Sequence, residues 1–144
     1  MKNFKRILSL MLILVMALSF AACGNKSQEE ETDPYDGKYA KVFELGETEF
    51  EFEVINKEGE TTLYLVKTDK ETVGDALLET ELISGEESQY GLYVTTVDGL
   101  TLDYNADKYY WAFYVDGQYA EVGVDSMEVV PGAKYSFVAE QSQY

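Results

Sequence analysis

The side chains in this sequence that could do chemistry are few, and the most informative of them is a single thiol. Cys23 is the only cysteine among 144 residues, and there is no histidine. The thiol follows a basic start over 2–6, an apolar run over 7–20 and two alanines. A cationic segment, an apolar segment too short for a comfortable membrane span, and small residues are together typical of a secretory signal peptide. The position of the thiol therefore indicates export.

The residues around Cys23 resemble the lipobox of bacterial lipoproteins. Phe20 stands three residues before the cysteine, where Leu is more usual, and Ala21 and Ala22 come directly before it. In that family the sulfur receives a diacylglycerol and cleavage leaves the cysteine first in the mature chain. The resemblance implies lipidation at Cys23 and anchoring on the extracytoplasmic face of the cell membrane. An ordinary secreted protein with a free thiol and an N-terminal signal anchor are the alternatives.

The charge balance narrows the partners and the chemistry. Asp and Glu number 27 against 11 Lys and Arg, a net charge of −16. Nucleic-acid affinity comes largely from Lys and Arg, so we exclude nucleic acid as a partner, and anionic lipid headgroups should also repel this surface. Without histidine the commonest general base and transition-metal ligand are missing. Nucleophile motifs and phosphate-binding glycine loops are also absent. The sequence predicts neither an enzyme nor a bound cofactor.

One segment partly matches a calcium-binding loop. The spacing of Asp103, Asn105 and Asp107 corresponds to the first three ligands of such a loop. Lys108 stands where the loop needs glycine, and Tyr114 where it needs a bidentate glutamate. We interpret the segment as a turn with solvated carboxylates and predict no metal site.

The elements that position these groups can be read from periodicity. Alternating apolar and glutamate residues predict a half-buried strand over 49–55, whose glutamates form a solvated acidic face. A second strand over 61–67 returns after the loop NKEGE. A helix of roughly three turns should follow, with Thr72 as N-cap and Gly85 as its end. The last strand is predicted over 134–140.

Two Asp-Gly pairs, at 98–99 and 116–117, predict tight hairpins because glycine tolerates the positive φ of a type I′ turn. Around the first turn, one face should carry the opposed residues Tyr93, Thr95, Val97, Leu100, Leu102 and Tyr104. Two strands, one helix and then hairpins predict an α+β domain in which one short helix crosses a mixed sheet.

The strand predicted over 109–115 carries aromatic residues on both faces. Trp111 and Phe113 are the better core candidates, which leaves the tyrosines of this hairpin facing outward. Outward tyrosines could form a recognition patch, or an aromatic cross-strand ladder that only stabilises the hairpin. The candidate ligand-binding residues are Tyr110, Trp111, Tyr114 and Tyr119.

The domain organisation follows from composition. Residues 24–37 are polar and acidic without hydrophobic periodicity, which is typical of a solvated tether. We predict a signal peptide over 1–22, the lipidated cysteine and a flexible acidic linker over 23–42, and one domain over 43–144.

The segments TVGDALLE, YGLYVTTVDG and YWAFYVDGQYAEVGVDSMEVVPGAKYSFVAE resemble the transcobalamin C-terminal-like domain. Bacterial lipoproteins often carry this domain, largely of unknown function, as their only module. The likeness covers roughly 50–140, and Pro131-Gly132-Ala133 replaces a Gly-Asp pair that many members carry before the last strand. It implies a β-grasp-like sheet crossed by one helix.

The resemblance also implies a binding role. In animal cobalamin carriers the equivalent domain is one half of a clamp, and a large α-helical barrel, for which this chain has no room, is the other. We expect a lipid-anchored extracytoplasmic module that binds cobalamin, another corrinoid or a similar small amphipathic ligand and passes it to a membrane transporter. The alternative is a non-enzymatic cell-surface module that docks on a protein by a sheet edge or the tyrosine-rich hairpin. The oligomeric state stays open.

Overall fold

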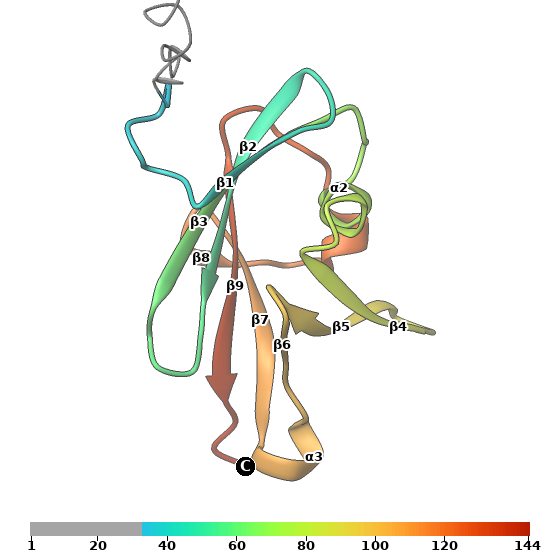
Figure 1. Ribbon diagram of the computed structural model, residues 1–144. Coiled ribbons are helices and arrows are strands. Elements are labelled where there is room, and N and C mark those ends of the chain that lie inside the picture. Colours follow the sequence, from blue (N-terminus) through green and yellow to red (C-terminus); the bar gives the residue numbers. More distant parts are fainter. Residues whose placement is uncertain (1–32) are drawn as a thin grey trace, which may run out of the picture. The chain divides into compact units, whose positions relative to one another are not determined.

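A six-stranded mixed sheet dominates the computed structural model, which describes residues 33–144 (Figure 1). Neighbouring strands follow the order β1-β3-β2-β9-β7-β8. The central strands β2 and β9 run parallel, although they come from opposite ends of the domain. The strand bounds are β1 Lys41–Glu44, β2 Thr48–Ile55, β3 Thr61–Thr68, β7 Tyr109–Val115, β8 Gln118–Tyr119 and β9 Lys134–Gln141.

A second, three-stranded antiparallel sheet has the order β4-β5-β6. Its strands are β4 Ile83–Ser88, β5 Gly91–Val97 and β6 Leu100–Thr101. Three helical segments complete the fold: α2 Val73–Glu79, α3 Tyr104–Asp107 and the 3₁₀ turn η1 Val124–Ser126. The structure confirms an α+β fold with a mixed sheet and a short helix, and it places the hairpin predicted at Asp98-Gly99 in a second sheet together with β4, a strand that the sequence did not predict.

The core forms where the apolar faces of β2, β9 and β7 meet helix α2. Phe50 and Phe52 of β2 and Tyr135 of β9 are fully buried. The Phe50 and Tyr135 rings meet edge to face, with centroids 5.2 Å apart, and the Phe113 and Phe137 rings stack at 5.0 Å. Full burial of a side chain of this size contributes about 1.5–3 kcal/mol. The structure therefore confirms the strands that the alternation of apolar residues predicted at 49–55, 109–115 and 134–140.

Helix α2 begins as predicted and ends earlier than predicted. The Thr72 hydroxyl accepts a hydrogen bond from the Asp75 N–H at 3.2 Å, the N-cap interaction. The helix ends at Glu79. The Thr80 hydroxyl then donates to the Leu77 carbonyl at 2.7 Å, and Glu81 has a positive φ of 62°.

The prediction that Gly85 ends the helix was wrong. Gly85 lies in β4, where the pairing register with β5 shifts between Ser84 and Gly85. A Cβ at this position would lie only 2.0 Å from the Tyr93 carbonyl oxygen. Glycine is needed here because two strands approach closely at a bulge, not because a helix stops.

Both Asp-Gly hairpins are confirmed. The φ angles are 50° and 76° at Asp98-Gly99 and 47° and 80° at Asp116-Gly117, positive at both central residues as a type I′ turn requires. The predicted pairing across the first hairpin holds near the turn, where Val97 faces Leu100. It was wrong further out, because Tyr104 does not oppose Tyr93 and instead begins α3.

The predictions for Cys23, the signal peptide and the first half of the acidic linker, residues 23–32, lie outside the described residues. Strand β1, which the sequence did not predict, begins at Lys41 and pairs in parallel with β3. Within residues 33–144 no helix is long and apolar enough to cross a membrane.

Candidate functional site

The β7–β8 hairpin presents its aromatic residues in two directions. Trp111 and Phe113 are 7% and 8% exposed and point into the core, as predicted. Tyr110 and Tyr114 lie on the other face and are half-buried. Tyr119, opposite Tyr114 on β8, is 63% exposed, and the two rings meet edge to face at 5.4 Å. The hairpin thus offers tyrosine to solvent while its tryptophan is packed inside.

A cleft of about 300 Å³ lies between β5, β7 and the segment 120–124 that leads to η1. Its walls are mainly aromatic and aliphatic, and Glu121 is the one charged residue among them. The lining comes from residues 92–94 of β5, Tyr110, Trp111 and Phe113 of β7, Tyr119 of β8, Phe137 of β9 and the segment 120–124. An apolar cleft with few polar groups is the usual form of a small-molecule site.

The cleft forms because β8 is short. Strand β8 pairs with β7 only at Tyr114 and Val115, and the Ala120 N–H adds one bond to the Phe113 carbonyl at 2.9 Å. Beyond that point the chain leaves β7 and turns toward η1. The Trp111 indole N–H donates to the Thr95 carbonyl at 3.2 Å and ties β7 to β5 across the bottom of the gap. Trp111 therefore serves as a floor whose polar atom is already satisfied.

Beside the cleft, two tyrosines share one carboxylate. Glu140 of β9 accepts hydrogen bonds from the hydroxyls of Tyr110, at 3.1 Å, and of Tyr114. The pKa of Tyr114 is raised to about 12, mainly by the hydrogen bond to Glu140 and to a smaller extent by burial. The pKa of Tyr110 is raised as well, mainly by burial and to a smaller extent by the bond to Glu140. The carboxylate therefore keeps both phenols protonated and fixes the direction of their rings.

We expect Glu140→Gln to move the ionisation of Tyr114 from about 12 toward the ordinary tyrosine value of about 10. The folded pKa lies above the unfolded one, so this phenol stabilises the fold below pH ~10, and the contribution is lost as the pH rises toward ~12. Ultraviolet titration of tyrosinate measures the shift. Glu128→Gln, at an exposed carboxylate, is the control. Superimposable titration curves for Glu140→Gln and the unsubstituted protein would contradict the assignment.

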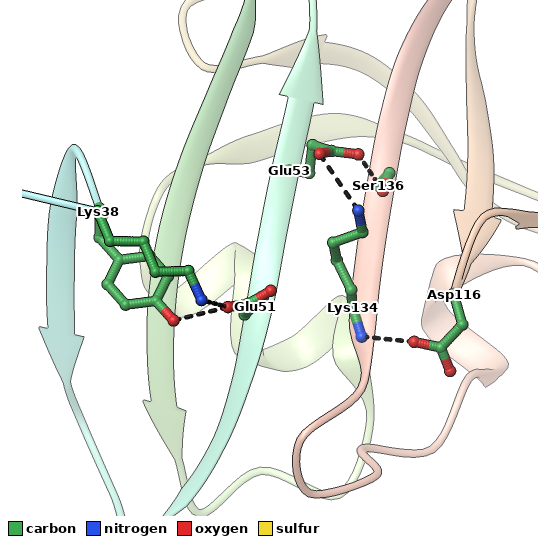
Figure 2. A network of polar contacts seen from close by, with 7 residues as sticks. Lys38, Glu51, Glu53, Asp116, Lys134 and Ser136 are labelled. Atoms are coloured by element: carbon green, nitrogen blue, oxygen red, sulfur yellow. Dashed lines mark hydrogen bonds and ion pairs between the residues drawn. The ribbon is translucent and has the colours of Figure 1, made fainter. Parts of the chain in front are cut away.

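The glutamates of β2 are not the freely solvated row that the sequence predicted. Glu51 accepts hydrogen bonds from the Lys38 ammonium and from the Tyr39 hydroxyl (Figure 2). Both bonds lower the pKa of Glu51, and the bond from Lys38 has the larger effect. Glu53 accepts from the Ser136 hydroxyl at 3.0 Å and from the Lys134 ammonium at 3.4 Å. Glu53 therefore links β2 to β9, and Glu51 links β2 to the segment before β1. Neither arrangement separates an acid from a base.

The segment that partly matched a calcium loop has structural roles. Asp103 caps α3 by accepting from the Asn105 N–H at 2.9 Å. Asp107 accepts a hydrogen bond from the Lys57 ammonium at 2.5 Å. This bond is the main cause that lowers the pKa of Asp107, and a bond from the Tyr109 backbone N–H lowers it further. Within residues 33–144 no three His, Cys, Asp or Glu side chains lie close enough together to hold a metal ion.

The structure brings three of the four candidate residues together. Tyr110, Trp111 and Tyr119 line the cleft, whereas Tyr114 lies outside it, bonded to Glu140. Their role in binding a ligand remains a prediction. The sequence did not identify the contribution of β5, above all Tyr93, which is 50% exposed. The alternation in YGLYV indicated that Tyr93 lies on one face of β5. Because β4 was not predicted, the sequence did not show which face of β5 borders the cleft.

Comparison with known proteins agrees with the predicted resemblance. Residues 70–137 match the family described as "Domain of unknown function (DUF4430)". A crystal structure described as a "putative metal binding protein" from Ruminococcus gnavus is 25% identical, with a TM-score of 0.64 over 67% of this chain and 99% of that one. Haptocorrin in complex with Cbi is 20% identical, with a TM-score of 0.56 over 65% of this chain and 25% of haptocorrin. No protein of curated function matches the sequence.

The likeness to the transcobalamin-like fold is therefore confirmed. The domain spans nearly all of the R. gnavus protein but only a quarter of haptocorrin, so the latter comparison shows a shared fold alone. Neither description names an enzyme.

Proposed function

We propose that this protein is a non-enzymatic binding module whose ligand is a flat, amphipathic small molecule, with a corrinoid as the first candidate. The observation that carries the proposal is the aromatic cleft between β5, β7 and the segment 120–124. Its volume of about 300 Å³ lies at the lower end for small-molecule sites, and it is too small to enclose a whole cofactor. It would hold one face or edge of a larger ligand.

Two features of the surroundings support this ligand class. Trp111 and Phe113 offer ring surface at the floor, and Tyr119, exposed at the rim, can stack against a planar group. Haptocorrin, which shares the fold, is known in complex with Cbi. The chain corresponds to a quarter of haptocorrin, so we expect weak binding unless a partner such as a membrane transporter covers the open side of the ligand.

The proposal is tested by titrating the purified protein with cobalamin and with cobinamide. Trp111 is the only tryptophan, so quenching of its fluorescence reports on the cleft. Because corrinoids absorb light, free N-acetyltryptophanamide corrects for absorption, and calorimetry gives an independent signal. We expect Tyr119→Ala to weaken binding by about tenfold through loss of a large aromatic contact. Tyr144→Ala, at a fully exposed tyrosine, is the matched control.

The absence of both heat and corrected quenching at millimolar ligand would contradict the corrinoid proposal. Equal losses of affinity in Tyr119→Ala and Tyr144→Ala would contradict the placement of the ligand in the cleft.

One feature favours docking on a protein as the second candidate function: β8 pairs with β7 only at Tyr114 and Val115, so much of β7 lacks a strand partner on that side. A cross-linked protein partner that is lost in a Tyr110→Ala, Tyr114→Ala double variant would favour it.

We further propose that the module is held on the extracytoplasmic face of the cell membrane by a lipid on Cys23. The support is the arrangement of basic, apolar and small residues that precedes the cysteine. A single acyl chain binds a membrane only marginally, whereas the several chains of a bacterial lipoprotein anchor stably. Mass spectrometry of the N-terminal peptide tests the proposal, and an unmodified thiol in a cytosolic protein would overturn it.

A further inference from the structure

A second hollow, of about 370 Å³, is lined by three tyrosines: Tyr93 of β5, Tyr104 of α3 and Tyr110 of β7, with Ser142 at its edge. It shares Tyr93 and Tyr110 with the cleft. The rings of Tyr104 and Tyr110 are 6.5 Å apart at an interplanar angle of 65°. Tyr93 is 50% exposed, so its ring is available from solvent. Three aromatic rings thus surround one open space, and the face of an aromatic ring attracts a cation that lies close to it.

The charges around this hollow are mainly negative. Glu86 lies directly opposite Tyr93 in the β4–β5 pairing and is exposed. On the other side, Glu140 accepts from the Tyr110 hydroxyl. In the described part of the chain neither carboxylate forms an ion pair, since the five bridges there use other acids. With a net charge of −16, the surroundings repel anions and attract cations.

A cation already lies at one of these rings. The Lys108 ammonium stands 4.8 Å from the centroid of Tyr104. Lysine ammonium groups lie over aromatic rings elsewhere on this domain too, with Lys41 at 4.4 Å from Phe43 and Lys57 at 4.6 Å from Tyr109. The face of Tyr104 is thus accessible to positive charge, and Lys108 acts as a tethered competitor for it.

We propose that Tyr93, Tyr104 and Tyr110 bind a quaternary ammonium group. The hollow is lined by three tyrosines and one serine, and no carboxylate is among its lining residues to replace the water around a primary ammonium. A quaternary ammonium has no N–H to satisfy and a diffuse charge, which suits aromatic surfaces. The inference concerns a different class of ligand from the one proposed for the cleft and holds whether or not a corrinoid binds there.

The test compares choline with 3,3-dimethylbutan-1-ol, which has the same shape but no charge, by calorimetric titration of the purified protein. We expect choline to bind about tenfold more tightly, since the two ligands differ by the cation–π attraction. Tyr93→Leu keeps an apolar side chain and should remove most of this preference, whereas Tyr144→Leu should leave it unchanged. Equal affinities for the two ligands, or no binding of choline at millimolar concentration, would overturn the proposal.

A second variant tests where the cation lies. Lys108→Met removes the competing ammonium from Tyr104, so we expect choline affinity to rise by a few fold. An unchanged or lower affinity would contradict the placement of the cation against Tyr104. Phosphatidylcholine vesicles distinguish the source of the group. Displacement of bound choline by the vesicles would assign the group to a lipid headgroup, and the absence of displacement would assign it to a free solute.

Discussion

Replacing Trp111 by alanine should lower the free energy of unfolding by about 3–5 kcal/mol. The indole is 7% exposed and lies between two cavities, the cleft of about 300 Å³ and a hollow of about 260 Å³ beside the β2–β3 turn. Its removal would join these spaces through the middle of the domain, so packing on both sides would be lost. The hydrogen bond from its indole N–H to the Thr95 carbonyl of β5, at 3.2 Å, would be lost with it.

The measurement is urea unfolding followed by far-ultraviolet circular dichroism, because the variant has no tryptophan to report on unfolding. Trp111→Phe separates packing from hydrogen bonding. It keeps a ring but loses the bond to the Thr95 carbonyl, which still accepts from the Leu102 N–H at 2.9 Å. We expect it to cost roughly 1–2 kcal/mol. A loss below about 1 kcal/mol in Trp111→Ala would show that the two sheets do not depend on this residue.

The second large effect runs against helix propensity. In an exposed helix, replacing glycine by alanine gains about 1 kcal/mol. Gly74 lies in the first turn of α2, where an added Cβ would be 2.7 Å from the Asp125 Cα and 3.0 Å from the Val124 carbonyl oxygen. These are backbone atoms of η1, which cannot rotate aside as a side chain can. We therefore expect Gly74→Ala to lower the free energy of unfolding by about 1–3 kcal/mol.

The contact cannot relax easily, because backbone bonds hold α2 to the chain around η1. The Val73 N–H donates to the Met127 carbonyl at 2.8 Å, and the Val129 N–H donates to the Glu71 carbonyl at 2.9 Å. Glu79→Ala, on the same helix, removes only an exposed ion pair with Lys70 and should change stability by less than about 0.5 kcal/mol. Urea unfolding of the two variants measures the difference, and a Gly74→Ala protein more stable than the unsubstituted one would refute the packing argument.

The parts of the fold that could be predicted from sequence are those with a strong local signal. Strand β2 alternates glutamate with an apolar residue from Glu49 to Val54, and each Asp-Gly pair allows few conformations other than a tight turn. The N-cap at Thr72 was equally local. For the same reason Trp111 and Phe113 could be assigned to the core, since they share a face of one strand.

The first strand of the second sheet could not be predicted, because it has no apolar alternation. Strand β4 reads ISGEES, and only Ile83 is buried. It is held by pairing with β5 and by the close approach at Gly85. A glycine after an amphipathic segment usually marks a helix end, and only the position of the Tyr93 carbonyl oxygen shows why it is needed here. The place of Tyr93 at the candidate site could not be derived for the same reason.

The position of β9 in the sheet has a consequence for biogenesis. β9 is the last strand to leave the ribosome, yet it lies between β2 and β7, and the bond from Ser136 to Glu53 joins residues 83 positions apart. Until residues 134–141 emerge, β2 and β7 have no common neighbour and the apolar face of the large sheet is incomplete. Such long-range pairing slows folding. A nascent chain would therefore reach its stable fold only after residues 134–141 had been synthesised and could insert between β2 and β7.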